Sequence, residues 1–548
     1  MKQSVYIIAA MFAAFASPLQ AQDTYLNDRL TNTNDLIGTA RYVGMGGALG
    51  ALGADLSVMS SNPAGTGLYR RADLAGTISV MTQKDRQAKG EDFTHFSFDQ
   101  MGFVYSAHLG EDKLKYVSFG VNYQKKLNFN HALIADHGNP GGLSQSMQLA
   151  DQCNLRPPYE DGEGNWGYPT DLTGAAYNGY VFDSNREVVS NPNDVFYWGD
   201  PAFENQYSRV TDGSLQGFDF NLSFNLANRV YLGFTLGVDN MDYDSRSIYT
   251  EYRDGVETDD EGKPVDFMAL DYSLLTDHRV SGYGFNFKAG VIVRPFEESP
   301  FRLGLAFETP TYYTLRSSVY SQVESTFDAD GYYLEQGIYT HPGIDSYLEY
   351  DVRTPWKVRL SAGHTVGTML AIGAEYEYAN YSKTVMGYGS DEYYYDDFSR
   401  RIDKDKDMNR LTDKTLKGTH TLKLGFELKP ANNLSLRFGY NYISKSYEEN
   451  ARFDLPLNSY AALYNHHTDY TNLGDVNIFT AGLGYRFKHF YMDLAYKFRR
   501  QSGEFYAFDD SFRTGKDFVG TEYANMQLTP VDVNLNRHQA FLTLGYKF

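Results

Sequence analysis

A period-two alternation of apolar and mixed residues recurs along this chain and constrains its fold more than any other feature. In HQAFLTLGYKF, residues 538–548, one face carries only apolar and aromatic side chains: Ala540, Leu542, Leu544, Tyr546 and Phe548. The opposite face mixes polar, small and aromatic residues. Successive side chains of a β-strand point to opposite faces, so this segment predicts a strand with one apolar face.

The same pattern recurs in segments 230–239, 421–429, 433–442 and 490–498. A soluble β-sandwich also alternates, but its apolar faces must fill a shared core. Here the apolar faces end in Tyr and Phe, while the opposite faces carry charges and glycine. Aromatic girdles outside and a polar lumen inside are typical of a transmembrane β-barrel, which we therefore favour over a sandwich.

Fourteen candidate strands follow from this pattern. They are 72–83, 98–109, 114–127, 216–227, 229–242, 278–294, 300–317, 346–364, 367–385, 418–429, 433–446, 476–487, 489–502 and 537–548. Short and long connectors alternate between them, as periplasmic turns and extracellular loops do. We predict an all-β transmembrane fold, a 14-stranded antiparallel outer-membrane β-barrel over residues 71–548. Its long acidic connectors, such as 128–215 and 386–417, are expected to form a solvated outer surface.

The N-terminus has the composition of an export signal. A lysine precedes the short apolar stretch Val5–Ala16, and SPLQAQ offers a cleavage site after Ala21. Residues 1–21 are therefore expected to be a cleavable signal peptide that directs the chain to the outer membrane. No run of about 18 apolar residues follows, so no membrane-spanning helix is expected.

Composition and motifs exclude several function classes. The formal net charge is −20, which is unsuited to binding nucleic acid. The single cysteine, Cys153, forms no intrachain disulfide. Neither GxSxG nor HExxH occurs, so we expect no enzyme and no cofactor.

Two loop segments raise the question of a metal or haem site. Asp403, Asp405, Asp407 and Asn409 have the spacing of a calcium loop, but the turn glycine and the twelfth-position glutamate are missing. Calcium binding by this loop stays open. His466 and His467 are adjacent in another loop, where haem ligation stays open as well.

A glycine-rich stretch, GMGGALGALGADLSVMSSNPAG, occupies residues 44–65. It does not follow an apolar strand and lacks the lysine of a phosphate loop, so nucleotide binding is excluded. A 14-stranded barrel is too wide for its wall side chains to fill. Residues 22–70 are therefore expected to form a small luminal plug, which small residues allow to pack closely against the wall.

The same stretch resembles the N-terminal hatch of the FadL/TodX-type outer-membrane transporters, in the style of their Bacteroidetes branch. The matching residues are Gly38, Ala40, Ala54, Asp55, Ser57, Asn62, Pro63 and Ala64. The strand count of that family agrees with the predicted one. Its barrels also end in an aromatic assembly signal, which implies recognition of Phe548 by the barrel-assembly machinery.

The resemblance implies passive uptake of hydrophobic molecules, such as long-chain fatty acids, through a barrel surrounded by outer-membrane lipid. A ligand would enter a pocket beside the hatch and leave through a shift of the hatch or a gap in a kinked strand. Asp55, Ser57, Asn62, Pro63 and Ala64 are the implied gate residues. The expected ligand contacts are the nearby apolar residues Met45, Leu49, Leu52 and Met59.

Two other functions stay open at this point. The long Tyr- and Asp-rich loops could recruit a partner, which would make the chain a surface-interaction or secretion-accessory barrel. A haem-binding receptor is the other alternative. The ligand itself, whether fatty acid, aromatic hydrocarbon or haem, is not specified by any motif.

Overall fold

We analysed a computed structural model of the chain. It describes residues 23–33, 35–84, 93–110, 113–137, 142–160, 166–184, 195–253, 271–327, 337–340, 343–389, 402–457, 459, 462, 464–509 and 527–548. The expected signal peptide, residues 1–21, lies outside this range. No helix in these residues is long and apolar enough to cross a membrane.

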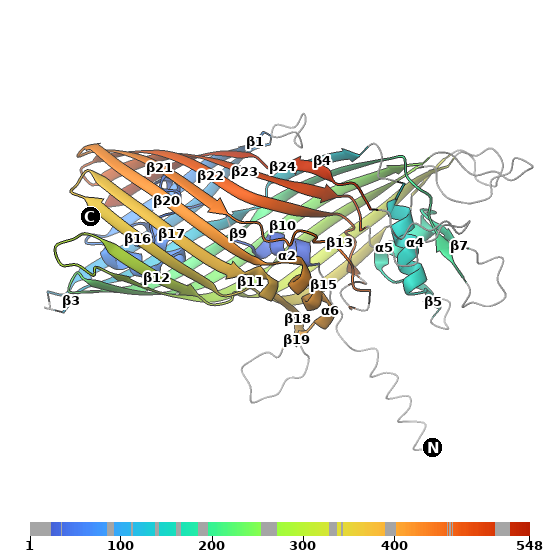
Figure 1. The fold of residues 1–548 in the computed structure, drawn as a ribbon, viewed down its shortest axis with the longest axis horizontal. Helices are drawn as coiled ribbons and strands as arrows, with labels where there is room; N and C mark the ends of the chain where they lie inside the picture. The colour runs from blue at the N-terminus through green and yellow to red at the C-terminus, as the bar shows by residue number, and fades with distance from the viewer. Residues whose placement is uncertain are drawn as a thin grey trace, which may run out of the picture.

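All described strands except β5 to β8, which form two small separate sheets, belong to one closed antiparallel β-barrel (Figure 1). Strand β1 (Asp73–Gln83) pairs with β2 (Thr94–His108) on one side and with β25 (Arg537–Lys547) on the other, which closes the wall. From β2 onward the wall consists of β3 (Leu114–Asn128) with β4 (His131–His137), β9 (Glu204–Leu226), β10 (Val230–Tyr252), β11 (Asp271–Val293), β12 (Arg302–Glu308) with β13 (Tyr312–Phe327), β16 (Lys357–Val366) with β15 (Ile344–Arg353), β17 (Leu370–Asn380) with β18 (Val385–Gly389), β20 (Gly418–Ala431), β21 (Leu434–Ile443), β22 (Tyr470–Phe487), β23 (Phe490–Tyr506), and β25 with β24 (Val531–Asn534). The predicted 14-stranded antiparallel barrel is confirmed.

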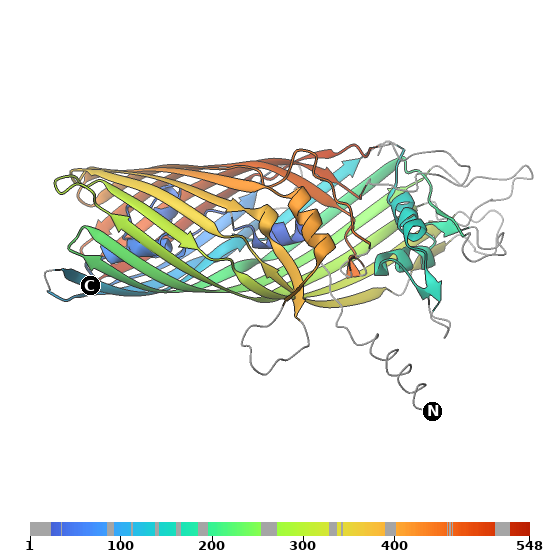
Figure 2. The same cartoon turned by 60° about the horizontal axis from the view of Figure 1, so that its bottom comes forward.

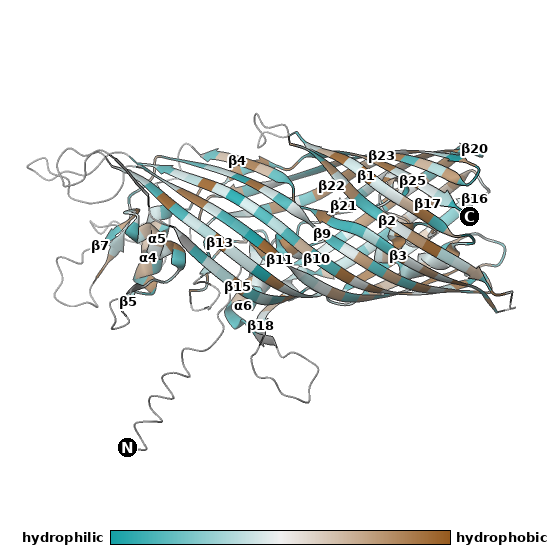
Figure 3. Cartoon of the chain, turned by 180° about the vertical axis from the view of Figure 1, so that it is seen from behind, coloured by the Kyte–Doolittle hydropathy of each residue, from teal (hydrophilic) through white to brown (hydrophobic). Residues whose placement is uncertain are grey.

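Figure 3 shows hydrophobic and hydrophilic residues interspersed along the wall strands, and the exposed side chains show that the apolar face points outward, as a bilayer requires. On β23, Phe490 and Leu494 are exposed on the outer surface, while Asp493 and Lys497 are buried inside. On β25, Leu544 is exposed and Thr543 is buried. Backbone pairing around the closed wall satisfies the polar groups that lipid cannot hydrate.

Strands β9, β10 and β11 are each 23 residues long and extend well beyond the predicted segments. Their polarity reverses along their length. On β10, Phe234 and Leu236 are exposed outside, but further on the outward residue Arg246 pairs with Asp277 of β11 at 2.6 Å. In this region the buried residue Tyr243 faces inward. These extensions therefore have water outside and packed protein inside.

The connector 128–215 is more ordered than predicted. It contains β4, α4 (Gln145–Leu155), α5 (Asp171–Asn178), the short strands β5 (Tyr159–Glu160), β6 (Trp166–Gly167), β7 (Asp183–Ser184) and β8 (Tyr197–Trp198), and the start of β9. Apolar residues of α4 and α5, including Leu149, Cys153 and Leu172, are buried against the ends of the wall strands. The expectation of a solvated surface is wrong for these residues. Figures 1 and 2 show both helices at the barrel end away from the C-terminus.

Candidate functional site

Residues 23–70, hereafter the luminal segment, lie inside the barrel (Figure 1). The segment contains α2 (Thr24–Thr31), α3 (Ala40–Gly44) and the 3-10 helices η1 (Leu56–Ser60) and η2 (Pro63–Leu68). Helix α3 packs against β22 and β23, and η2 packs against β9, β10 and β11. The luminal segment therefore packs against the wall on two sides of the lumen.

Glycines permit close contact between the luminal segment and the wall. A Cβ atom on Gly439 of β21 would lie 2.1 Å from the backbone nitrogen of Gly46. Gly46 itself has φ +61°, in the left-handed region that favours glycine. On the opposite side, a Cβ on Gly290 of β11 would lie 2.1 Å from Oδ1 of Asn62. Glycines of the wall and of the luminal segment therefore allow their backbones to pack at close range.

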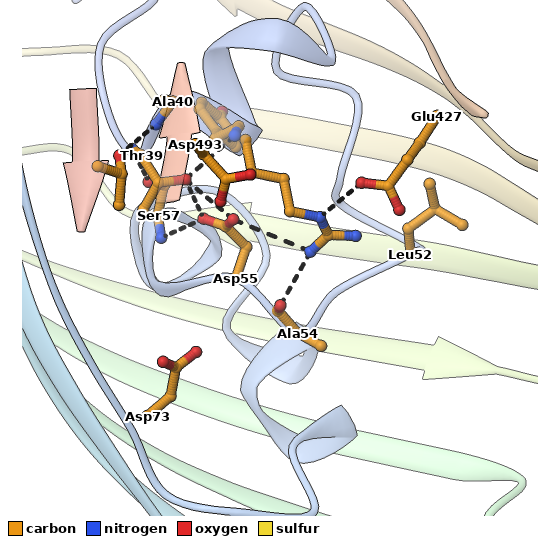
Figure 4. A network of polar contacts seen from close by, with 12 residues as sticks. Thr39, Ala40, Leu52, Ala54, Asp55, Ser57, Asp73, Glu427 and Asp493 are labelled. Carbon is orange, nitrogen blue, oxygen red and sulfur yellow. Dashed lines mark hydrogen bonds and ion pairs between the residues drawn. The ribbon is translucent and has the colours of Figure 1, made fainter. Parts of the chain in front are cut away.

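Asp55 and Ser57 belong to one buried network at the start of α3 (Figure 4). The Thr39 hydroxyl donates to Asp55 at 2.9 Å, and Asp55 also accepts from the Ser57 backbone N–H at 3.0 Å. The Ser57 hydroxyl oxygen accepts from the Thr39 backbone N–H at 2.9 Å. The two expected gate residues therefore tie η1 to α3 within the luminal segment.

Arg41 connects this network to the wall. Its Nη1 donates to the Ala54 carbonyl at 2.9 Å, and its Nε donates to Glu427 of β20 at 3.1 Å (Figure 4). Glu427 also accepts from Arg437, which in turn pairs with Asp493 at 2.5 Å. The charges alternate in sign along this chain of contacts, so a displacement of α3 would expose unpaired charges.

The expected gate residues Asn62, Pro63 and Ala64 form the start of η2. The Asn62 side chain accepts from the Ala64 N–H at 3.2 Å and donates to the Gly50 carbonyl at 2.9 Å. Pro63 occupies the first turn, where a missing N–H costs nothing. Ala64 is buried against Tyr231. These residues therefore link the glycine-rich turn to the wall.

The four expected ligand contacts lie within the packing of the luminal segment. Met45, Leu49 and Leu52 belong to a buried apolar cluster that includes Phe541 of the wall. Met59 packs in a second cluster with Val104. In this closed arrangement they contact protein, and their role toward a ligand stays a prediction.

A cavity of about 180 Å³ lies between the luminal segment and the connectors on the α4 side. It is lined by α2, by the junction of β3 and β4, by β9 and β10, and by β21 to β25. The lining joins apolar residues such as Leu127, Phe129 and Tyr243 to several charged ones. Helix α2 is held beside it through Tyr25, which stacks on Tyr447 with ring centroids 5.2 Å apart.

Positive charge is concentrated around the cavity. The lining includes four arginines, Arg29, Arg209, Arg499 and Arg537. His131 lies among them on β4, opposite Thr211 of β9. Burial lowers the pKa of His131 well below its usual value, and the four arginines lower it further.

Two carboxylates also line the cavity, but both are engaged. Asp35 pairs with Lys497 at 3.0 Å. Asp28 accepts from Asn32 at 3.0 Å and from Ser446 at 3.1 Å, and burial raises its pKa. The cavity is therefore amphipathic, with apolar walls and an excess of cationic groups.

The wall beside the cavity contains a seam between β2 and β3. Pairing between these strands ends at Gln100 and Gln124, although β2 begins at Thr94 and β3 continues to Asn128. Asp99 has no partner position in the β1–β2 register, so it forms a bulge. We call residues 94–99 and 125–128 the seam.

Side chains bridge the seam in place of the missing ladder. Lys125 donates to the Ser97 hydroxyl at 2.7 Å, and the rings of Phe98 and Tyr123 stack with centroids 5.6 Å apart. Gln124, at the end of the ladder, donates to the Ile37 carbonyl of the luminal segment at 2.6 Å. Leu127 and Asn128 of the seam line the cavity. The luminal segment, the seam and the cavity are therefore in direct contact.

The adjacent histidines lie just before β22, and they have different partners. His466 contacts Ser321 and Ser346, each at 2.8 Å, whereas His467 contacts His278 at 2.6 Å. Burial is the main cause that lowers the pKa of His467 to about 3, and Arg209 and Arg29 lower it further. Both histidines therefore dock the segment that precedes β22 onto the opposite wall.

The calcium-loop spacing corresponds to a helix start in the structure. Asp405 caps α6 (Lys406–Thr415) by accepting from the N–H groups of Asp407 and Met408. The exposed Asp407 pairs with Arg410 at 2.9 Å within that helix. In the part of the chain that the structure describes, no group of three His, Cys, Asp or Glu side chains could hold a metal ion.

The cavity arginines were not identified from the sequence. Arg209 lies on the extension of β9, where the outward face is no longer apolar and the strand signal ends. Arg499 had a usable signal, because the alternation of β23 places it on the same face as Asp493 and Lys497. Continuing the alternation from Lys497 to the next position on the same face, residue 499, predicts a second cation in the lumen.

Comparisons with known proteins give structural matches only. No protein-family model matches the chain, and no curated protein matches it. The toluene transporter TbuX of Ralstonia pickettii aligns over 94% of this chain and 99% of its own, with 11% identity and a TM-score of 0.47. A Pseudomonas aeruginosa FadL homologue aligns over 97% and 100%, with 14% identity and a TM-score of 0.48. The P. putida toluene transporter TodX aligns over 94% and 99%, with 12% identity and a TM-score of 0.46. The chain is thus similar in architecture to outer-membrane transporters of the FadL/TodX type.

Proposed function

We propose that this protein is an outer-membrane channel for the passive uptake of hydrophobic molecules, such as long-chain fatty acids, and that the luminal segment gates it. The observation that carries the proposal is the contact between the cavity and the seam. A ligand in the cavity lies beside Leu127 and Asn128, where side chains alone join β2 to β3.

The ionic floor of the lumen favours a sideways exit. Below the cavity, an apolar ligand that moved straight through would have to pass Arg41, Glu427 and Arg437, which are held in ion pairs. Desolvating these groups against an apolar chain is costly. Parting the seam toward the bilayer instead exposes the ligand to lipid, where its apolar surface is stable.

The luminal segment is suited to control the seam, because Gln124 donates to the Ile37 carbonyl and also accepts from Ser60 at 3.2 Å. A small displacement of η1 or of residue 37 would release the end of the β2–β3 ladder. Gating by this movement needs no energy source and no chemical step.

Crosslinking across the seam tests the exit. The long Lys125 side chain now bridges to Ser97, so cysteines at these two positions, joined by a short reducible bis-thiosulfonate crosslinker, would span the seam. Cysteines at Ser106 and Ser118, treated in the same way, span an intact part of the ladder, where the two hydroxyls lie 2.9 Å apart. We expect crosslinking of the Ser97/Lys125 pair to abolish uptake of a fluorescent fatty acid, with recovery on reduction. The Ser106/Ser118 pair should leave uptake unchanged. Full uptake through the crosslinked Ser97/Lys125 pair would contradict a seam exit.

A further inference from the structure

We propose that the cavity recognises the doubly charged oxyanion headgroup of an amphiphile, of which an alkyl phosphate is the simplest example. This inference rests on the proposed uptake function and specifies the chemical class of its ligand. It follows from two arginines that face the cavity with little to neutralise them.

Arg29 and Arg499 have few protein partners. Arg29 donates to the Tyr243 hydroxyl at 3.3 Å, and Arg499 donates to the Gln501 side chain at 2.8 Å. Among the described residues, neither guanidinium has a carboxylate oxygen within 4.0 Å. Each guanidinium carries five N–H donors, so one neutral acceptor leaves most of them available.

The other charged groups that line the cavity have partners within the protein. Arg537 donates to the Asn128 carbonyl at 3.0 Å, and Lys445 pairs with Glu449 at 3.8 Å. Arg209 pairs with Asp469 at 2.5 Å, and Asp35 pairs with Lys497.

Burial raises the pKa of Asp28, which weakens it as a counter-charge for Arg29. The guanidiniums of Arg29 and Arg499 are only partly buried, and the carboxylates near them, Asp35 for Arg499 and Asp23 and Asp28 for Arg29, make no ion pair with them within 4.0 Å. A bound anion that contacts both guanidiniums directly would therefore be stabilised.

The presence of two guanidiniums favours a phosphate monoester over a carboxylate as the headgroup. A carboxylate carries one negative charge and would neutralise only one of the two guanidiniums. A phosphate monoester carries about −1.5 to −2 at neutral pH and offers three oxygens to fork-shaped donors. The apolar lining residues Leu127, Phe129 and Leu133 provide adjacent contact for the start of an alkyl chain.

Binding of matched probes to the full-length protein in neutral detergent tests this inference. Dodecyl phosphate, dodecanoate, dodecanol and inorganic phosphate would each be titrated by calorimetry. We expect dodecyl phosphate to bind at least tenfold more tightly than dodecanoate or dodecanol, and inorganic phosphate to bind more weakly than dodecyl phosphate. Arg29→Gln and Arg499→Gln should each weaken dodecyl phosphate at least tenfold and leave dodecanol unchanged.

Two further variants guard against misfolding. Arg499→Lys retains the positive charge but loses the paired N–H donors of the guanidinium. It should bind dodecyl phosphate with an affinity between those of the native chain and Arg499→Gln. Arg246→Gln, on the exposed outer face, should bind all probes like the native chain.

If dodecanoate binds as tightly as dodecyl phosphate, the proposed preference for a doubly charged headgroup is wrong. If dodecanol also binds as tightly, the cavity does not recognise anions. Inorganic phosphate binding as tightly as dodecyl phosphate would identify a free ion as the ligand. Failure of every alkyl probe to bind would count against the uptake function itself.

Discussion

The two halves of the lumen are filled in different ways. In the half near the short turns, residues 35–70 meet the wall at glycines, and Arg41 shares Glu427 with Arg437. In the half near α4 and α5, α2 leaves a cavity in which Arg29 and Arg499 face open space. The first half is a closed protein interior, and the second has the character of a binding site. A protein that admits a ligand without becoming a permanent pore needs both.

Overpacking the closed half should have the largest effect. Gly439→Val places side-chain atoms where the backbone of Gly46 now lies, so we expect the luminal segment to be displaced at a cost of about 3 kcal/mol or more. Protease accessibility of residues 35–70 measures the displacement. Gly76→Ala on β1, where the nearest atom to the new Cβ is 3.9 Å away, is the matched control and should behave like the native chain. A Gly439→Val protein with a protected luminal segment would show that the contact is not tight.

Acidification should loosen the segment that precedes β22, where His467 contacts His278. His467 has a pKa of about 3 when docked and about 6.5 when released, so the docked state is fully stable above pH 6.5 and loses stability as the pH falls toward 3. Between pH 6.5 and 4.5 the loss is about 2–3 kcal/mol. The groups around it are His278, His466, Arg209, Arg29 and Asp469.

The melting temperature measured against pH checks this expectation. His467→Asn cannot take up a proton and should have a flatter profile than the native chain over this range. Identical pH profiles for the two proteins would show that His467 does not set the acid sensitivity.

Removing the link between the luminal segment and the wall should have a smaller effect. Arg41→Ala leaves Asp55 and Glu427 without their shared partner, but the Arg41 side chain is 22% exposed, so water can partly replace it. We expect a loss of about 1–3 kcal/mol, below the full cost of breaking a buried pair. Arg246→Ala breaks an exposed outer-face pair and should cost less than about 1 kcal/mol. Chemical denaturation compares the two variants, and equal losses would remove the distinction between inner and outer pairs.

The smallest expected effect concerns Asn62. Asn62→Ala loses both the cap of η2 and the contact with Gly50, at a cost of about 1 kcal/mol. Asn62→Asp retains the capping oxygen and should recover part of that loss. Hydrogen exchange at residues 63–68 measures the change, and unaltered exchange in Asn62→Ala would show that the wall alone holds η2.

Sequence reasoning located all fourteen strands, because lipid outside and a polar lumen inside impose one alternation on each. It did not extend β9, β10 and β11 to their full length, since beyond the bilayer the apolar residues move to the inner face, as Tyr243 does. It also missed the interruptions at Pro310 and Pro355, which separate β12 from β13 and β15 from β16. A proline supplies no ladder N–H, so both positions were identifiable in principle.

Small residues and an Asn-Pro turn are local signals, so the sequence alone could indicate a compact segment before the first strand. The cavity was not predictable, because its lining comes from α2, β9, β23 and β25, which only the closed barrel brings together. The cavity arginines are far apart in the sequence, and their sequence separations give no sign that they lie close together in space.

The long β9, β10 and β11 strands also determine where a ligand is first met. Each continues for more than ten residues past its apolar outer face, which at the usual rise and tilt raises the rim by about 30 Å. The rim therefore stands clear of the apolar belt of the wall. The cavity lies within this raised part, since Arg209 and Thr211 of β9 and Tyr243 of β10 line it, so the extensions enclose the cavity from the side.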